Sequence, residues 1–93
     1  MKLKRILTTG AVAATFVIGA AAPALAESVG GGTWYHGVGG GEVWSDYYHG
    51  SSCHTASVNG AYFERATANA GIWARADAPD TIWVDEAYWN NRC

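Results

Sequence analysis

Three histidines and two cysteines are the residues best suited to chemistry in this sequence: His36, His49, His54, Cys53 and Cys93. Imidazole and thiolate groups are common ligands of zinc and copper. The spacing of the five matches no strong metal-binding pattern, and a cysteine in an oxidising compartment is more often half of a disulfide. We therefore expect structural or exposed histidines and no metal site.

A nucleophilic enzyme would need a serine or cysteine beside a histidine and an orienting carboxylate or amide. These residue types are present, at Ser45, Ser51, Ser52, His49 and Asp46. No nucleophile-elbow pattern surrounds any serine, and the glycine triplets lack the lysine and the following helix of a phosphate-binding loop. The sequence therefore predicts a protein that is not an enzyme and holds no cofactor.

The N-terminus predicts export. A short positive start at residues 2–5 precedes an uncharged apolar run at residues 6–22, and small residues follow at Ala24 and Ala26. This order is typical of a secretory signal peptide. The rival is a membrane anchor, but the apolar run is near the lower limit for crossing a bilayer. We expect a helical signal that is cleaved between Ala26 and Glu27, with no stable membrane insertion.

Cleavage would leave residues 27–93 as a single secreted, extracellular domain. This part has three arginines, no lysine and eight carboxylates, hence a formal net charge of −5. Such a charge argues against binding to nucleic acid or to an anionic membrane. A domain this small buries only about 60% of its unfolded surface, so a disulfide or a homodimer would help to stabilise it.

Two cysteines in an exported domain indicate a disulfide. Cys53 and Cys93 allow one intramolecular pair. The pair would close a loop of about 40 residues and stabilise the fold by about 4 kcal/mol through chain entropy. Two free thiols, or a bond between chains, remain open alternatives at the level of the sequence.

Short aromatic and β-branched stretches separated by turn signals predict an all-β sandwich or small barrel. We expect six strands, at residues 33–38, 42–49, 54–58, 61–66, 71–76 and 81–89, after a flexible glycine-rich lead-in at 27–32. The alanine-rich surroundings of 71–76 would also allow a helix. Gly71 and Pro79 favour a strand there.

The dipeptide Asn59-Gly60 predicts a hairpin with a two-residue type I′ turn, since both residues accept positive φ. That register pairs Val58 with Ala61 and Ala56 with Phe63, and it places these four side chains on one core face.

The aromatic residues allow two interpretations. Large rings bury much area and suit a small core. Alternatively, tryptophans opposite the aliphatic faces of the last two strands form a recognition or dimer surface. The two interpretations are not exclusive. In the last two strands we expect the aliphatic side chains, Ile72 and Ile82 among them, to lie inside and Trp73 and Trp83 to lie outside.

The chain resembles the lactococcin 972 family of bacteriocins. The segments that carry the resemblance are GTWYHG at 32–37, SDYYHGS at 45–51, HTASV at 54–58, AGIWARA at 70–76 and YWN at 88–90. The resemblance implies a small sandwich of two three-stranded antiparallel sheets that forms a homodimer. It also implies a secreted antibacterial protein that blocks septum formation through lipid II instead of forming pores.

We therefore expect a bacteriocin-like protein that binds a cell-envelope target of Gram-positive bacteria stoichiometrically. The motif positions are the candidates for target binding: Trp34, His36, Tyr47, His49, Trp73 and Arg75. The alternative is a non-killing secreted module that uses exposed tryptophan faces to hold cell-wall glycan or a protein partner. A secreted enzyme inhibitor with a loop held by Cys53–Cys93 is a third hypothesis.

Overall fold

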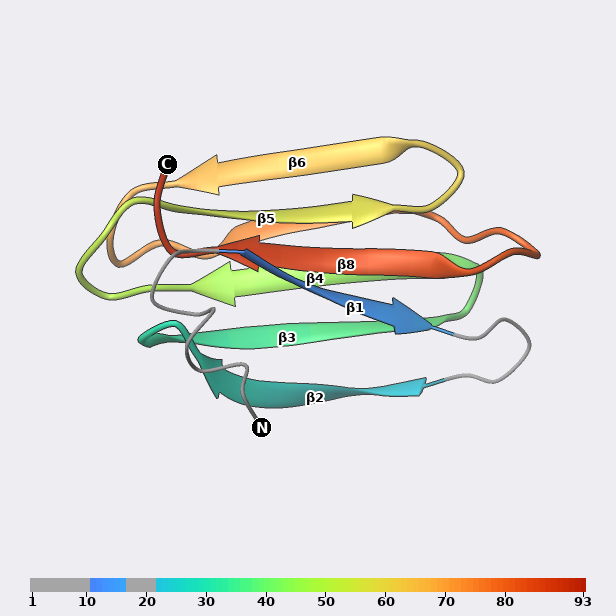
Figure 1. The fold of residues 1–93 in the computed structure, drawn as a ribbon, viewed down its shortest axis with the longest axis horizontal. Coiled ribbons are helices and arrows are strands. Elements are labelled where there is room, and N and C mark those ends of the chain that lie inside the picture. The colour runs from blue at the N-terminus through green and yellow to red at the C-terminus, as the bar shows by residue number, and fades with distance from the viewer. Residues whose placement is uncertain (1–10, 17–21) are drawn as a thin grey trace.

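Eight strands in two antiparallel sheets make up the part of the chain that the computed structural model describes, residues 11–16 and 22–93 (Figure 1). The strands are β1 (Ala11–Phe16), β2 (Ala22–Val29), β3 (Gly32–Gly39), β4 (Glu42–Tyr48), β5 (His54–Asn59), β6 (Phe63–Ala68), β7 (Ala74–Pro79) and β8 (Asp85–Asn90). The all-β prediction is confirmed. Within the described residues, no helix is long and apolar enough to cross a membrane.

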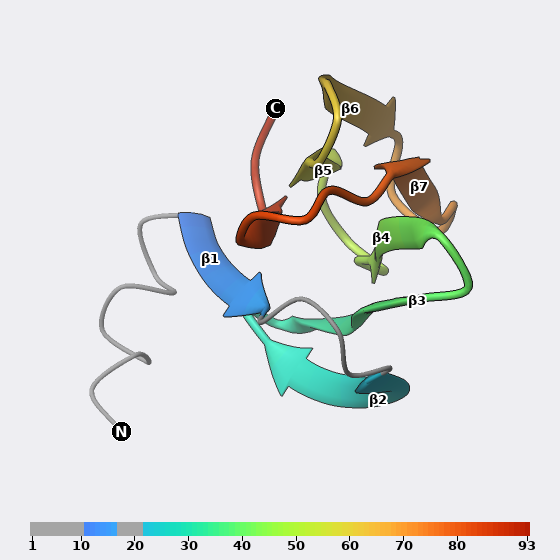
Figure 2. The same ribbon diagram turned by 90° about the vertical axis from the view of Figure 1, so that its right-hand side faces the viewer.

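One sheet has the order β1-β8-β5-β6, and the other has the order β2-β3-β4-β7. We call them sheet A and sheet B. They pack face to face as the two layers of a sandwich (Figure 2). The chain changes sheet between β1 and β2, after β4, after β6 and after β7. At one side of the sandwich β6 lies next to β7, so the two sheets meet there.

Large rings packed against alanines fill the space between the sheets. Trp34 and Tyr47 of sheet B and Trp89 of sheet A are each at most 2% exposed. The facing side chains are small, namely Ala56, Ala74, Ala76, Ala78 and Ala87. The first interpretation of the aromatic residues, large rings in a small core, is therefore confirmed for these three side chains.

Two glycine pairs make the tight turns of sheet B. Gly30 and Gly31 have φ of 62° and 83°, and Gly40 and Gly41 have φ of 62° and 88°. Two consecutive positive φ angles suit the two-residue turns of twisted hairpins. The expected flexible lead-in at 27–32 is wrong, because residues 27–29 belong to β2 and pair with β3.

The expected register of the Asn59-Gly60 hairpin is also wrong. Asn59 pairs with Phe63, and Ala56 pairs with Ala66. Asn59 does not have positive φ, and Gly60 is not among the glycines that do. Instead, the amide of Ala61 donates to Pro79 O at 2.8 Å, which anchors a three-residue loop to the end of β7. The odd-numbered shift turns Phe63 outward, where it is 52% exposed.

The expected aliphatic core faces of the last two strands are not found. Ile72 and Ile82 are 59% and 76% exposed. Strands β7 and β8 begin three and four residues later than expected and bury alternate residues from Ala74 and Asp85 onward. Asp85 is buried and accepts hydrogen bonds from the amide and the hydroxyl of Thr81, so it holds residues 81–84 in a loop instead of a strand.

The N-terminal segment differs from the expected signal helix where it is described. Ala11–Phe16 pairs with β8, and Ala22–Val29 pairs with β3. Unpaired edges of β8 and β3 offer backbone hydrogen bonds to any extended apolar segment, which explains strands here. Without residues 1–26, β1 and most of β2 would be absent, and the complete strands left would be β8-β5-β6 and β3-β4-β7, the two three-stranded sheets expected. Residues 1–10 and 17–21 of the expected signal lie outside the described part, and its cleavage stays a prediction.

The expected disulfide is present. Cys53 and Cys93 are bonded, with their Cα atoms 5.4 Å apart and 40 positions apart in the sequence. The bond ties the segment after β8 to the start of β5. A cross-link over a loop of this length stabilises a small domain by about 4 kcal/mol in the chain-entropy model.

Candidate functional site

A groove of about 330 Å³ lies on the outer face of sheet B. Its lining comes from three strands and the segment before β7, namely Ala26, Thr33, Tyr35, Trp73 and Arg75. Alternation along each strand produces this lining, because the side chains between these positions point into the core. Ala26 precedes the expected cleavage site, so a processed chain would form the groove from the other four residues.

Arg75 is held at this groove by two neighbours. Strand pairing sets Asp46 opposite Arg75, and Arg75 Nη1 donates to Asp46 Oδ2 at 3.1 Å. The guanidinium carbon also lies 4.9 Å from the ring centre of Trp73. A cation over an indole face is an attractive arrangement. The two contacts fix both the charge and the ring beside it.

Further aromatic side chains extend this surface. The ring of Tyr48 lies 5.5 Å from that of Trp73, and Tyr35 sits across the sheet, 40% exposed. Trp73 itself is 37% exposed. A large exposed ring next to hydroxyls and one oriented cation is suited to bind the face of a sugar or a partner protein.

Arg75 offsets only part of the cost of burying the charged carboxyl of Asp46. Burial raises the pKa of Asp46 above its usual value, the Arg75 charge and hydrogen bond lower it, and Asp77 raises it again. The net direction is upward. The ion pair therefore positions Arg75 more than it stabilises the fold, as is common for surface ion pairs.

Of the six expected target-binding residues, two belong to the core. Trp34 and Tyr47 are 2% and 0% exposed. The indole of Trp34 donates to Ser45 Oγ at 2.9 Å, and the hydroxyl of Tyr47 donates to Val29 O at 2.8 Å. Ser45 in turn donates to Tyr88 O in the other sheet. These rings hold the sandwich together and are covered from solvent in this structure.

Two more of the six are histidines with structural contacts. His36 stacks on Trp34 with ring centres 3.7 Å apart, and its Nε2 lies 3.3 Å from Glu27 Oε2. His49 accepts the amide of Ser52 at Nδ1, at 3.1 Å. Its Nε2 lies 3.1 Å from Gly30 O. His49 therefore joins the turn after β2 to the loop after β4.

His54, the third histidine, is fully buried. Its ring nitrogens lie 2.8 Å from Ser52 O and 2.7 Å from Ile72 O, so the ring bridges β5 and the segment before β7. No group of three or more His, Cys, Asp or Glu residues that could hold a metal ion occurs in the described part of the chain.

Trp73 and Arg75 are thus the expected residues that the structure brings together on the surface. Tyr35 lines the groove with them, whereas Tyr48 contacts Trp73 and Asp46 contacts Arg75 beside it. None of these three was expected as a binding residue. The alternation in residues 33–36 was the signal that could have identified Tyr35, since a buried Trp34 requires an outward Tyr35.

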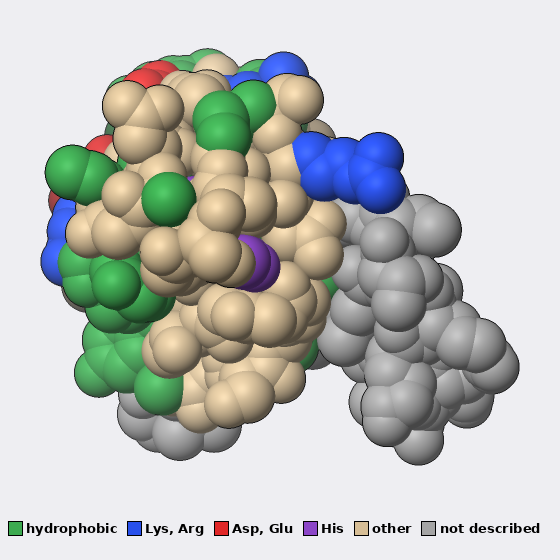
Figure 3. Space-filling model, turned by 90° about the vertical axis from the view of Figure 1, so that its left-hand side faces the viewer, with side chains coloured by type: hydrophobic (Ala, Val, Ile, Leu, Met, Phe, Trp, Pro, Cys, Tyr) green, Lys and Arg blue, Asp and Glu red, His purple; other side chains and the backbone are tan. Residues whose placement is uncertain are grey.

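Figure 3 views the end of the sandwich with the β2–β3 turn and the C-terminus, where hydrophobic side chains gather on one flank.

A second exposed apolar feature is the loop between β7 and β8. Ile82, Trp83 and Val84 are 76%, 74% and 56% exposed. The Thr81 hydroxyl, which Asp85 holds, accepts the amide of Trp83 at 3.1 Å. The loop is therefore shaped by hydrogen bonds and not by burial of its side chains. Trp83 on this loop is therefore an exposed tryptophan outside the groove, with which Trp73 can be compared.

Comparison with known proteins gives one match. The family model described as bacteriocin (lactococcin 972) matches residues 30–89, which is more than half of the chain and spans β3 to β8 almost completely. No curated protein and no solved structure shows a significant match.

Proposed function

Because the chain belongs to the lactococcin 972 family of bacteriocins, we propose that it is a secreted antibacterial protein that binds a cell-envelope target through the groove of Trp73 and Arg75. The action is stoichiometric and does not involve catalysis. The observation that carries the proposal is the placement of these two motif residues side by side on an exposed face.

The shape and chemistry of the groove support a saccharide-bearing target. The Trp73 ring offers an apolar face, Thr33 and Tyr35 offer hydroxyls, and Arg75 offers a fixed cation next to them. Lipid II combines sugars with a charged pyrophosphate. The family resemblance implies lipid II as the target and inhibition of septum formation as the result. We propose lipid II as the target on these grounds.

The test uses the oxidised protein recovered from the medium of a secreting host. Titration with lipid II, followed by tryptophan fluorescence, is paired with growth inhibition of Gram-positive strains and microscopy of their septa. Trp73→Ala is expected to weaken binding at least about tenfold, as for an aromatic anchor. Trp83→Ala is the matched control, because that ring is more exposed but lies on the β7–β8 loop.

The outcomes separate the hypotheses. Binding of lipid II with inhibited septation, lost in Trp73→Ala and kept in Trp83→Ala, supports the proposal. Growth inhibition without lipid II binding keeps the antibacterial function and replaces the target. Binding of cell-wall glycan without any growth inhibition supports the non-killing binding module instead.

A further inference from the structure

A second groove, of about 300 Å³, lies on the outer face of sheet A. Strand pairing builds it from three strands: Ser57 of β5 lies between Arg65 of β6 and Tyr88 of β8. Phe63 and Arg92 also line it. None of these residues belongs to the site of Trp73 and Arg75, which is on the opposite sheet.

The groove gathers positive charge in an acidic domain. Residues 27–93 contain three arginines, and two of them, Arg65 and Arg92, line this groove. In the described part of the chain, the ion pairs join Arg75 to Asp46 and His36 to Glu27, and none involves Arg65 or Arg92. The two guanidinium groups are thus available to a ligand, and guanidinium forks suit phosphate and carboxylate groups.

The rest of the lining is suited to a sugar. The guanidinium carbon of Arg65 lies 5.3 Å from the ring centre of Phe63, which is 52% exposed. An exposed ring face can pack against a sugar ring, and the hydroxyl oxygens of Ser57 and Tyr88 in the lining can accept hydrogen bonds from the sugar hydroxyls. Glu86, a carboxylate on the same strand as Tyr88, accepts the Tyr88 hydroxyl and is thereby engaged.

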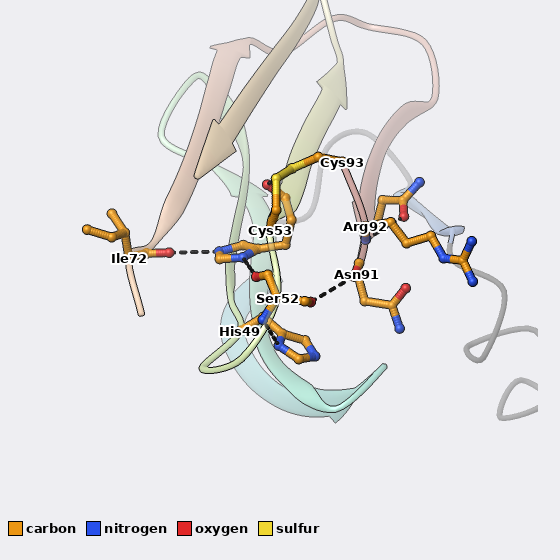
Figure 4. The surroundings of a disulfide bond; sticks show 9 residues. His49, Ser52, Cys53, Ile72, Asn91, Arg92 and Cys93 are labelled. Atoms are coloured by element: carbon orange, nitrogen blue, oxygen red, sulfur yellow. Dashed lines mark hydrogen bonds between the residues drawn. A yellow bond between two sulfur atoms is a disulfide. The ribbon is translucent and has the colours of Figure 1, made fainter. Parts of the chain in front are cut away.

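The disulfide holds Arg92 at the rim. Cys93 is bonded to Cys53, the hydroxyl of Ser52 donates to Asn91 O at 2.9 Å, and the amide of Arg92 donates to Asn90 Oδ1 at 3.0 Å (Figure 4). A side chain on a pinned segment loses less entropy on binding than one on a free tail.

We propose that the outer face of sheet A binds a small anionic saccharide, a sugar that carries a phosphate or a carboxylate, between Arg65 and Arg92. The net charge of −5 repels extended polyanions at long range. The groove therefore selects a compact anion of about one sugar in size. This site is independent of the proposed function, since it lies on the other sheet.

The test measures binding of three probes to the secreted, oxidised protein by amide NMR titration: glucose 1-phosphate, glucuronate and, as the neutral control, glucose. The variants are Arg65→Gln and Arg92→Gln. Ile82→Glu is the matched control, because it makes the same change of net charge at a position that is 76% exposed and lines neither groove. Loss of one charge-assisted contact is expected to weaken binding of the acids about tenfold or more in the first two variants and not in the third.

Each result has one meaning. Binding of either acid, weakened in Arg65→Gln and Arg92→Gln alone, supports the proposal, and the tighter acid identifies the preferred group. Glucose binding as tight as the acids overturns it, as does a lack of binding by both acids. Equal weakening in all three variants also overturns it, because that result would reflect net charge and not a site. Since Trp73 lies outside this groove, failure here leaves the proposed function untouched.

Discussion

Two tyrosine hydroxyls stay protonated in the folded protein for different reasons. A hydrogen bond to Glu86, with burial added, raises the pKa of Tyr88 to about 12. Burial raises the pKa of Tyr47 to about 12, and its hydroxyl donates to Val29 O. A donated hydrogen bond requires the neutral phenol. The stability of the fold therefore depends on pH in the alkaline range through both side chains.

The sign of this coupling is a loss of stability at high pH. Unfolded tyrosine ionises near pH 10, so the stability from each raised pKa is fully present below pH 10 and is lost as pH rises towards about 12. We expect Tyr47→Phe to flatten the fall in the free energy of unfolding over this range, measured with urea. Tyr62→Phe, at an exposed position, is the control and should keep the wild-type slope. A slope equal in both variants would contradict the prediction.

An ion pair suggests that Asp46 stabilises the fold at neutral pH, but the direction of its pKa shift predicts the opposite. Its pKa is raised above 3.8, chiefly by burial, so its ionisation at neutral pH costs stability in spite of Arg75. We expect Asp46→Asn to unfold at pH 7 with a free energy equal to or up to about 1 kcal/mol above that of the wild type. Below the ordinary pKa the two proteins should converge. A clearly less stable variant at pH 7 would show that the ion pair dominates.

Among the strands and loops, the hairpin of β5 and β6 depends on a close backbone approach. A Cβ atom at Gly60 would lie 2.5 Å from Pro79 O and 2.8 Å from Val43 Cγ1. We expect Gly60→Ala to destabilise the protein by about 1–3 kcal/mol through this overlap. Gly50→Ala is the control, because its Cβ would meet no atom closer than 3.8 Å. Equal thermal denaturation of both variants would contradict this account.

The strands before Gly60 could be predicted from the sequence more accurately than the strands after it. Strands β3, β4 and β5 were expected within about one residue, because glycine pairs and clear alternation bound them. From Gly60 onward each expected strand began two to four residues too early. The loop is set by a hydrogen bond from Ala61 to Pro79, 18 positions away, and no local propensity encodes such a contact.

Across the whole molecule, the sandwich decides which motif residues can meet a target. Strands β3 and β4 of sheet B each have one face in the core and one towards solvent, and both faces carry aromatic rings. Residue type alone therefore could not separate buried Trp34 and Tyr47 from exposed Trp73. The cysteine count did predict the disulfide, since two cysteines allow one pair in the chain. The groove of Arg65 and Arg92 was not foreseeable, because it depends on the β6 register.

Processing is expected to change the assembly of the protein. Cleavage after Ala26 would remove β1 and most of β2, which pair with β8 and with residues 35–38 of β3. The freed edges present unpaired backbone groups that favour pairing with a second copy. A domain this small also gains stability from a partner. The homodimer is therefore predicted for the processed chain and not for the full chain.

Two measurements on the same secreted sample test this prediction. Intact mass and N-terminal sequence should identify Glu27 as the first residue. Sedimentation at micromolar concentration should give twice the mass of residues 27–93, whereas the refolded chain of residues 1–93 should sediment as a monomer. A processed monomer at the same concentration would mean that the freed edges of β3 and β8 do not pair with a second copy. A dimer of both forms would place the interface elsewhere, since β1 and β2 would then not block it.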